Sequence, residues 1–509
     1  MIENIMSKKS PKHYSAITEK ACKKLSNTIK GNARPIKKVY ISDALPAVGK
    51  TEKFIKSASK NDHIVYALPT LKSLNEIRER LEKEKFNVLE VTSRDHFGVA
   101  SVIGDLLKNR EYIDPVVMLI SHAGLRTIEP KHLKDWTLVI DEIPDISNIS
   151  NSIIEENSYT LTLSSHILVD EDTGKVTVRN ESKKTVRAAA KARMRVGSIL
   201  PDTWVALDDD SVDVYIKYQI KLKNYQFNCV GYYDYVTAVD YAKETHILGH
   251  AVSRTLFYLH LEASGYTFEE SKFQPEPRPY NLTPVLVPIY SGDRISKAML
   301  TTNTKQQVTY VWSDEVDGHE ALVRVMEHNG ENPILIQTHK WCGYKWPDHA
   351  ENIGFDARGL NGYQDFNRTI NLIHGNSSGI EDRLYTLMLE RMGIDEQVGK
   401  DAICYSRFFE MIIQHICRTS LRKFEGQAER TVHYLPNEHT AKEIEKLLKI
   451  KCEIDTSIMR SPPLSDFQAG LEKKKNLAWG MLADGRAKKD IADFLDVDPS
   501  TLRRWLKAA

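Results

Sequence analysis

The first part of the chain alternates short apolar runs with amphipathic segments. The runs KVYISDA, NDHIVYALP, FNVLEVTS, DPVVMLIS and DWTLVID have the length and the β-branched content of buried strands. Between them, TEKFIKSASK and TLKSLNEIRERLEKEK have helical character, and the second repeats apolar residues at Leu71, Leu74, Ile77 and Leu81. Strands that alternate with helices predict a parallel, doubly wound sheet between residues 38 and 145.

The pattern changes between residues 151 and 240. TLTLSSHILVDEDTGKVTVRNE predicts a hairpin around Asp172-Thr173-Gly174, and KKTVRAAAKARMRVGSIL predicts a basic helix. We therefore expect an inserted α+β subdomain. Two sets of its side chains could face nucleic acid or, as we favour, form a solvated helix face and core packing: Arg187, Lys191, Arg193 and Arg195, and Tyr232, Tyr233 and Tyr235.

A second α/β pattern follows a proline-punctuated segment, KFQPEPRPYNLTPVLVP, which indicates a linker. HEALVRVMEHNGENPILIQTHK predicts a helix and a strand, TINLIHG a strand, FFEMIIQHICRTSLRKF a helix and TVHYLP a strand, and the chain is helical from about Leu471. The predicted fold class is α/β with two parallel-sheet lobes. The predicted domains are a lead-in (1–35), lobe 1 (36–150 and 241–275), the insert (151–240), lobe 2 (276–460) and a helical C-terminal domain (471–509).

Composition adds little beyond a general class. The 509 residues carry 70 Lys+Arg and 69 Asp+Glu, so any nucleic-acid contact needs a local basic surface. Six scattered cysteines without a CxxC pair argue against a zinc site or a disulfide framework. The N-terminus has no apolar signal region, and no apolar run is long enough for a membrane span. We expect a cytoplasmic protein of a bacterium or a virus-infected host cell, without a membrane partner.

The segment ALPAVGKT follows the first strand and precedes the first helix. It is similar to the phosphate-binding pattern G-x-x-x-x-G-K-[ST], with Ala44 at the first glycine position. A glycine turn at a helix N-terminus aims N–H groups at phosphate. The predicted phosphate site consists of Ala47, Val48, Gly49, Lys50, Thr51 and Glu52. The alternative is an ordinary strand-to-helix turn with Lys50 in solvent.

The strand LVIDE supplies the partner that such a loop needs. Asp141 and Glu142 stand at its end, where Asp141 with Thr51 would hold Mg²⁺ and Glu142 would act on the attacking water as general base. The alternative is a strand that ends in a solvated acidic turn. Together the two motifs predict an ATP- and Mg²⁺-binding site.

With these motifs the chain resembles the superfamily 2 helicases, in a divergent form like those of phages and mobile elements. Asp141-Glu142-Ile143-Pro144 matches their DExx motif. Pro69-Thr70 and Ser121-His122 are similar to two motifs that touch the nucleic-acid backbone, and Gly249-His250-Ala251 stands where the third motif belongs. For Thr70 the alternative is a helix cap.

The second half of the chain carries two further motifs of this family. Arg358-Gly359-Leu360-Asn361 resembles the fifth motif, which implies nucleic-acid contact for Arg358 and nucleotide contact for Gly359 and Asn361. Gln414, Arg418 and Arg422 resemble the sixth, which supplies an arginine finger. Its second arginine usually comes three residues after the first and here comes four after. We expect both on one face of one helix, with Arg418 as first choice for the finger. The alternative for each arginine is a surface ion pair.

The resemblance implies an ATP hydrolase with two RecA-like lobes. ATP would lie between them, and their closure would move strand-binding motifs along nucleic acid. It implies DNA as partner, single-stranded or duplex, with RNA as a further possibility, and it leaves oligomeric state and polarity open.

The tail KKDIADFLDVDPSTLRRWLKAA resembles the helix-turn-helix of resolvase-like and phage regulatory domains. Pro499 suits the first turn of a recognition helix. Side chains at its polar positions would meet DNA: Ser500, Thr501, Arg503, Arg504 and Lys507. The predicted core is Ile491, Leu495, Leu502 and Leu506. A DNA-binding domain of this kind suggests that the protein is recruited to a chosen DNA site, for example a replication origin. The alternative is a helical hairpin that docks on the lobes or on another subunit.

Two other functions fit the same motifs. A terminase-like packaging ATPase would carry a nuclease with clustered acids at strand ends in its second half, where this chain has arginine motifs instead. An ATP-gated DNA-binding regulator would use the nucleotide as a switch without motor activity.

Overall fold

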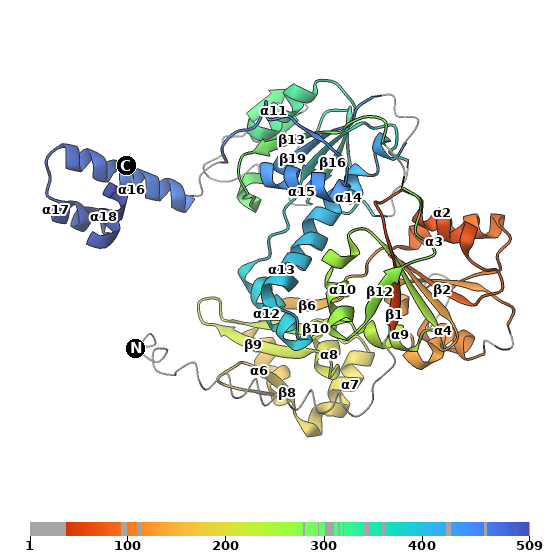
Figure 1. Ribbon diagram of the computed structural model, residues 1–509. Coiled ribbons are helices and arrows are strands. Elements are labelled where there is room, and N and C mark those ends of the chain that lie inside the picture. The colour runs from red at the N-terminus through yellow and green to blue at the C-terminus, as the bar shows by residue number, and fades with distance from the viewer. Residues whose placement is uncertain are drawn as a thin grey trace.

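The structure is a computed structural model of the chain, shown in Figure 1. It describes residues 37–92, 99–109, 111, 113–277, 280–293, 295–300, 310–313, 316–318, 320–339, 342, 346–358, 362–423, 429–462 and 466–507. The predicted N-terminal lead-in lies outside this part. No helix of the described residues has the length and apolar character that crossing a membrane requires.

Lobe 1 is built on a seven-stranded sheet with the order β12-β1-β11-β5-β2-β4-β3, and every pair in it is parallel. Apolar residues fill both faces because helices cover both, as parallel sheets require. The strands predicted from the sequence are all present. The elements of lobe 1 are β1 (Lys38–Asp43), α2 (Lys50–Ser57), β2 (Ile64–Leu68), α3 (Leu71–Lys83), β3 (Val88–Glu90), α4 (Val99–Lys108), β4 (Val117–Ser121), α5 (His122–Leu125), β5 (Thr137–Asp141), α9 (Val236–Tyr241), β11 (Glu244–Gly249), α10 (Leu256–Ala263) and β12 (Thr267–Glu270).

The insert leaves lobe 1 after β5 and returns before α9. Its three-stranded antiparallel sheet has the order β6-β10-β9, and the predicted hairpin around Gly174 is present as β7 and β8. It has a hydrophobic core of its own, which includes Trp204 and Phe227. Its elements are β6 (Ser147–Glu155), α6 (Glu156–Leu161), β7 (Ile167–Val169), β8 (Val176–Val178), α7 (Lys183–Lys191), α8 (Pro201–Asp208), β9 (Asp213–Gln219) and β10 (Asn224–Tyr232).

Lobe 2 contains a six-stranded parallel sheet with the order β17-β16-β18-β19-β13-β20. The predicted linker reaches into this sheet, because Val285 begins β13; that part of the linker prediction is wrong. The elements of lobe 2 are β13 (Val285–Tyr290), β14 (Tyr310–Ser313), β15 (Val316–Gly318), α11 (Glu320–Asn329), β16 (Ile334–Thr338), β17 (Ala350–Asn352), β18 (Arg368–Leu372), α12 (Gly379–Met392), α13 (Glu396–Cys404), α14 (Glu410–Ile416), β19 (Val432–Asn437), α15 (Glu438–Leu448) and β20 (Glu453–Ile454).

One helical hairpin, α12 and α13, links the lobes. It is inserted between β18 and β19 of lobe 2, yet Leu384, Met388 and Ile403 belong to the core cluster of lobe 1. Helix α12 lies beside β6 and β10 of the insert (Figure 1). A π-helical turn, Tyr405–Phe409, connects α13 to α14, so the helix runs from the core of lobe 1 into lobe 2. Lobe 1 and lobe 2 are therefore joined by packing as well as by the chain.

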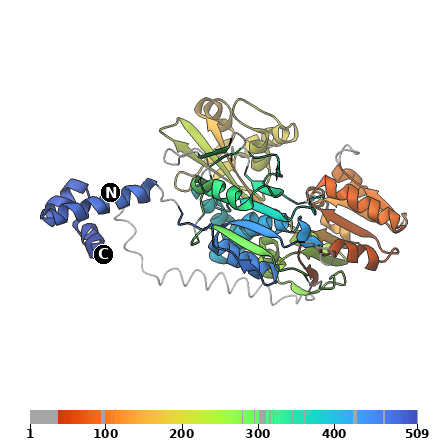
Figure 2. The same ribbon diagram turned by 90° about the horizontal axis from the view of Figure 1, so that it is seen from above.

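The C-terminal helices form a small unit that both views set apart from the lobes (Figures 1 and 2). They are α16 (Asp466–Ala483), α17 (Lys488–Leu495) and α18 (Pro499–Lys507), and α18 begins at the predicted proline. Three of the four predicted core residues are buried, and Leu506 is partly buried against them. The fold class predicted from the sequence is confirmed: two parallel-sheet lobes, an α+β insert and a helical C-terminal region.

Candidate functional site

The loop between β1 and α2, here called the cradle, has a backbone conformation that suits anion binding. Ala47 and Gly49 have positive φ angles, 65° and 100°, and the chain enters α2 directly after them. Left-handed residues turn successive N–H groups inward, and the helix N-terminus adds partial positive charge. The predicted residues Ala47, Gly49, Lys50, Thr51 and Glu52 line a cavity here, whereas Val48 is buried outside its wall.

Asp141 is held rigidly at the end of β5. Its Oδ2 accepts hydrogen bonds from the Thr51 hydroxyl at 3.0 Å and from the Tyr66 hydroxyl at 2.8 Å. Burial raises the pKa of Asp141, and the Tyr66 hydrogen bond and the Lys50 charge oppose that rise. The side chain is 8% exposed, so these donors replace the water that a surface carboxylate would have.

Glu142 occupies a strained position next to it. Its φ of 58° places a non-glycine residue in the left-handed region, and strain of this kind is concentrated at functional sites. Its buried Oε2 has no hydrogen-bond partner among the residues that the structure describes, and its Oε1 lies 3.8 Å from the Arg418 Nη2 of lobe 2. Burial raises the pKa of Glu142, which Arg418 opposes. A carboxylate in this state is suited to accept a proton.

Lobe 2 brings Gln414, Arg418 and Arg422 to the same cavity. The expectation of one helix for all three is wrong, because α14 ends at Ile416 and Arg422 lies in a separate 3₁₀ turn, Ser420–Arg422. Arg418 is 7% exposed; its Nε donates to the Ala357 carbonyl at 3.1 Å and its Nη2 to Gln414 Oε1 at 3.0 Å. The turn thus places both guanidinium groups at the cavity although no helical face is shared.

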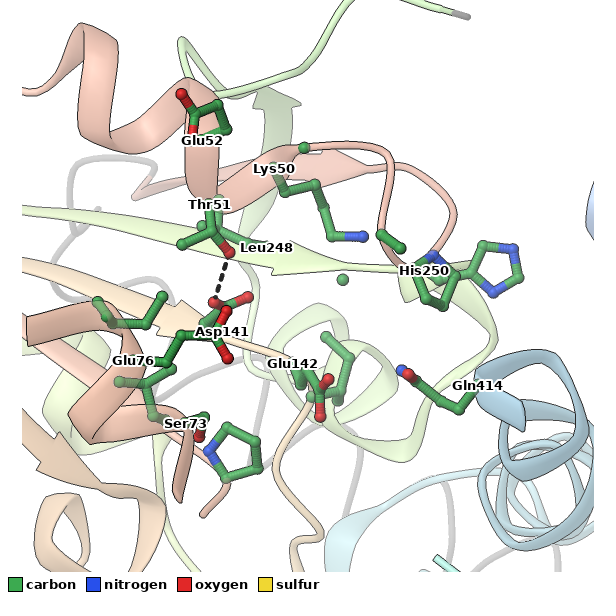
Figure 3. Close-up of a pocket in the computed structure, with 18 of the residues that line it drawn as sticks. Lys50, Thr51, Glu52, Ser73, Glu76, Asp141, Glu142, Leu248, His250 and Gln414 are labelled. Atoms are coloured by element: carbon green, nitrogen blue, oxygen red, sulfur yellow. Dashed lines mark hydrogen bonds between the residues drawn. The ribbon is translucent and has the colours of Figure 1, made fainter. Parts of the chain in front are cut away.

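The cavity has a volume of about 320 Å³ and is walled by both lobes. In Figure 3 the side chains of Lys50, Asp141, Glu142 and Gln414 approach one space from different elements. The Lys50 ammonium donates to the carbonyls of Ala44 at 2.6 Å and Leu45 at 2.8 Å, and burial lowers its pKa. The cavity therefore combines the cradle, a lysine head group that two loop carbonyls hold in place, and two carboxylates.

Magnesium fits this donor set. Thr51 Oγ1 and Asp141 Oδ2 already lie 3.0 Å apart at the mouth of the cradle. Mg²⁺ in nucleotide sites is bound by one or two protein oxygens while phosphate and water complete the octahedron. Thr51 and Asp141 would hold the ion, and when bound it would neutralise phosphate charge.

Two residues of the site escape sequence reasoning. Tyr66 bonds Asp141 from the neighbouring strand β2, and Glu410 lines the cavity from the first turn of α14. His250, which belongs to the segment placed at the third motif and follows β11 directly, lines the cavity and lies 3.1 Å from both the Tyr405 hydroxyl and the Leu447 carbonyl of lobe 2. An apolar strand pattern reports that Tyr66 is buried, but it does not report which side chain it faces.

The residues predicted to contact nucleic acid take several positions in lobe 1. Pro69 lines the same cavity, and Thr70 caps α3 by accepting a hydrogen bond from the Ser73 N–H. Ser121 caps α5, and His122 Nε2 lies 3.0 Å from the Asp141 carbonyl oxygen. Burial lowers the pKa of His122 to about 4, so this ring is neutral at pH 7.

The remaining predicted contacts lie in lobe 2 and the C-terminal unit. Arg358 lies beside Asp356 at the wall of a second cavity, whereas Gly359 and Asn361 lie outside the described residues. On α18, Ser500, Arg503 and Arg504 are exposed and Thr501 is partly exposed. These four positions are free to face a ligand, and their role stays a prediction.

Comparison with known proteins adds a weak likeness of fold. Among solved structures, the chain is similar to Xpd4 from S. tokodaii, with 12% identity, a TM-score of 0.42, and coverage of 86% of this chain and 99% of that chain. It is similar to an XPD helicase, with 12% identity, a TM-score of 0.42, and coverage of 82% and 96%. It is also similar to a DEAD box protein from the hyperthermophile Methanococcus jannaschii, with 11% identity, a TM-score of 0.26, and coverage of 83% and 89%.

A comparison with protein-family models matched no family, and a comparison with curated proteins found no relative. The chemistry of the site therefore rests on its own geometry.

Proposed function

We propose that the chain is an ATP-dependent motor on nucleic acid, a helicase or translocase of superfamily 2 type. One observation carries the proposal: a single cavity collects a phosphate cradle and two acids from lobe 1 and two arginines from lobe 2. Arg418 Nη2 of lobe 2 lies 3.8 Å from Glu142 Oε1 of lobe 1, so the parts of the site from the two lobes are in contact. A site built from two lobes makes ATP hydrolysis depend on their closure.

Each side chain has a role in this proposal. Lys50 and the N–H groups of the cradle bind the phosphates, and Glu142 accepts a proton from the attacking water. Arg418 stabilises the charge that develops on the γ-phosphate, with Arg422 as second choice. Gln414 fixes the Arg418 guanidinium through its amide oxygen. The Asp141 carboxylate is oriented for Mg²⁺ by Tyr66 and Thr51.

We further propose that the C-terminal unit recruits the motor to DNA. The exposed polar residues at the start of α18 and the buried apolar ones on its other side suit a recognition helix. Arg503 and Arg504 are exposed there and would contribute contacts to phosphate or base edges. A role in replication of a phage or mobile element rests on the sequence resemblance alone, and RNA is the alternative substrate of the motor.

The strand ends of lobe 2 favour a motor over a packaging nuclease. A nuclease would gather carboxylates at the carboxyl ends of these strands. The central strands instead end at Tyr290, Thr338, Leu372 and Asn437. Among the residues that the structure describes, no cluster of three or more His, Cys, Asp or Glu side chains could hold a metal ion.

The test is ATP hydrolysis with and without single-stranded DNA, duplex DNA and RNA, together with unwinding of tailed duplexes. Lys50→Ala and Glu142→Gln should abolish both hydrolysis and unwinding. Lys53→Ala is a matched control, because Lys53 lies on the next turn of α2 and its ammonium faces Glu276 at the limit of an ion pair.

Two outcomes would contradict the proposal. Hydrolysis that survives both Lys50→Ala and Glu142→Gln would remove the site assignment. Hydrolysis by the wild-type protein without strand displacement or translocation on any substrate would favour the ATP-gated regulator, and metal-dependent cleavage of DNA would favour the packaging enzyme.

A further inference from the structure

A second cavity, of about 190 Å³, lies next to the nucleotide cavity. Lobe 1 supplies the turn after β5 and the start of α10. Lobe 2 supplies the turn that carries Phe355 and Arg358, the π-helical turn, and Tyr385 of α12. Ile143 and Glu410 line both cavities, so they form the wall between them. Cavities for whole drug-sized ligands have about 300–1,000 Å³. This one has room for a planar group the size of one nucleobase.

The charges of the second cavity exclude a simple phosphate site. Two guanidinium groups of the lining, Arg358 and Arg407, already have carboxylate partners. Arg358 pairs with Asp356, with Nε–Oδ1 at 2.9 Å and Nη2–Oδ2 at 2.7 Å, and the Arg407 Nη2 lies 3.6 Å from Glu381 Oε1. Asp145 adds a further carboxylate to the lining. A phosphate would therefore meet cations that are already paired, whereas the edge of a base presents donors and acceptors together.

Aromatic side chains provide flat apolar walls. Phe355, Tyr385 and Phe257 line the cavity. Arg407 lies over the Tyr385 ring with its guanidinium carbon 5.8 Å from the ring centre, and its Nη1 donates to the Tyr385 hydroxyl at 3.1 Å. Aromatic faces beside fixed guanidinium planes are the surfaces on which proteins stack unpaired bases.

Glu410 is a deeply buried polar side chain in the lining of the second cavity. It is 6% exposed, and within the described part of the chain its carboxylate makes no hydrogen bond or ion pair. Burial raises its pKa to about 8, against the opposing charge of Arg358. A buried polar group without a partner is costly, so its retention at the wall of a cavity points to a partner that arrives from outside.

We propose that the second cavity receives one unpaired base of a nucleic-acid strand, stacked against Phe355 and Tyr385 with its polar edge on Glu410. The inference rests on the proposed function, since it names what the motor grips beside its nucleotide site. Glu410 also lines the nucleotide cavity, which contains Glu142. A base that binds Glu410 in the second cavity therefore changes the electrostatic environment of Glu142. Base occupancy would thereby be linked to ATP hydrolysis.

The test compares two fluorescently labelled single strands of equal length, one with bases and one abasic throughout, by anisotropy without ATP. Stacking of one base predicts that the normal strand binds about 5- to 150-fold more tightly. Phe355→Ala and the isosteric Glu410→Gln should each reduce this ratio. Phe268→Ala is the matched control, because Phe268 lies in β12 away from both cavities and should keep the ratio.

Melting curves of each variant separate loss of fold from loss of the ligand. A photoreactive base in the strand gives a second readout and should crosslink to the peptides that hold Phe355 or Tyr385. Equal affinity for the two strands, or an unchanged ratio in folded Glu410→Gln, would overturn the inference, as would crosslinks confined to other peptides. A wild-type protein that discriminates the strands but hydrolyses no ATP would instead overturn the proposed function and leave the base site standing.

Discussion

Removal of one hydroxyl, in Tyr66→Phe, tests how Asp141 is held. The hydroxyl donates to Asp141 Oδ2 at 2.8 Å, and Tyr66 is fully buried, so water cannot replace the lost donor. A hydrogen bond to a charged group contributes about 1.5–3 kcal/mol. In a domain of about 150–250 residues each kcal/mol shifts the melting temperature by about 2–4 °C, so lobe 1 should melt about 3–12 °C lower.

The same substitution in lobe 2 provides the control. Tyr405 is also buried, and its hydroxyl donates to the backbone carbonyl of His250 at 3.0 Å. Loss of this bond to an uncharged carbonyl should cost about 0.5–1.5 kcal/mol. Scanning calorimetry at pH 7.5 compares the two variants. Equal losses in both would refute the claim that Tyr66 stabilises a buried charge.

The pH dependence gives a second check on the same reasoning. The folded-state pKa of Asp141 is raised by burial, and removal of Tyr66 takes away a group that lowers it. Tyr66→Phe therefore destabilises the charged form of Asp141 more than the protonated form. The loss in free energy of unfolding should be complete above the folded-state pKa of Asp141 and should decline as the pH falls through that pKa. The Mg²⁺ concentration for half-maximal ATP hydrolysis should rise as well. A cost that is independent of pH, with unchanged Mg²⁺ dependence, would contradict the assignment.

Three further predictions concern other parts of the chain. Arg418→Ala should lower the kcat for ATP hydrolysis by about 10³-fold or more and Arg422→Ala by less, measured under ATP saturation; the reverse order would move the finger to Arg422. Ala47→Gly should stabilise lobe 1 by about 0.5–1 kcal/mol in thermal unfolding, because φ is 65° there and glycine adopts that angle without strain; destabilisation would argue against a strained cradle. Gly399→Ala should destabilise the α12–α13 hairpin by about 1–3 kcal/mol, because the new Cβ would clash with Leu389 Cδ2. A melting temperature equal to that of the wild-type protein would show that Leu389 moves away at no cost.

Strands β1 to β5 of lobe 1 were predictable because each is a short apolar run between helical segments, whereas β11 and β12 of the same sheet were not predicted. The same holds for the glycine turn before α2, whose glycine and lysine are adjacent in the chain, and for the acids at the end of β5; their binding of phosphate and Mg²⁺ stays a proposal. The single helix predicted for Gln414, Arg418 and Arg422 was not correct, because an apolar run shows that a segment is buried but does not show where its helix ends. The linker prediction failed in part because Pro284 directly precedes β13 and Pro288 lies inside it, so prolines did not mark the absence of a strand.

The sequence by itself determined the alternation of strands β1 to β5 with helices and the glycine turn before α2, because these depend on neighbours in the chain. Only the tertiary structure decided that Tyr66 bonds Asp141, that Glu410 separates two cavities, and that the α12–α13 hairpin joins lobe 2 to the core of lobe 1. These contacts join residues far apart in the chain. The packing of the whole sheet and of the facing lobe selects them, and no local pattern records that packing.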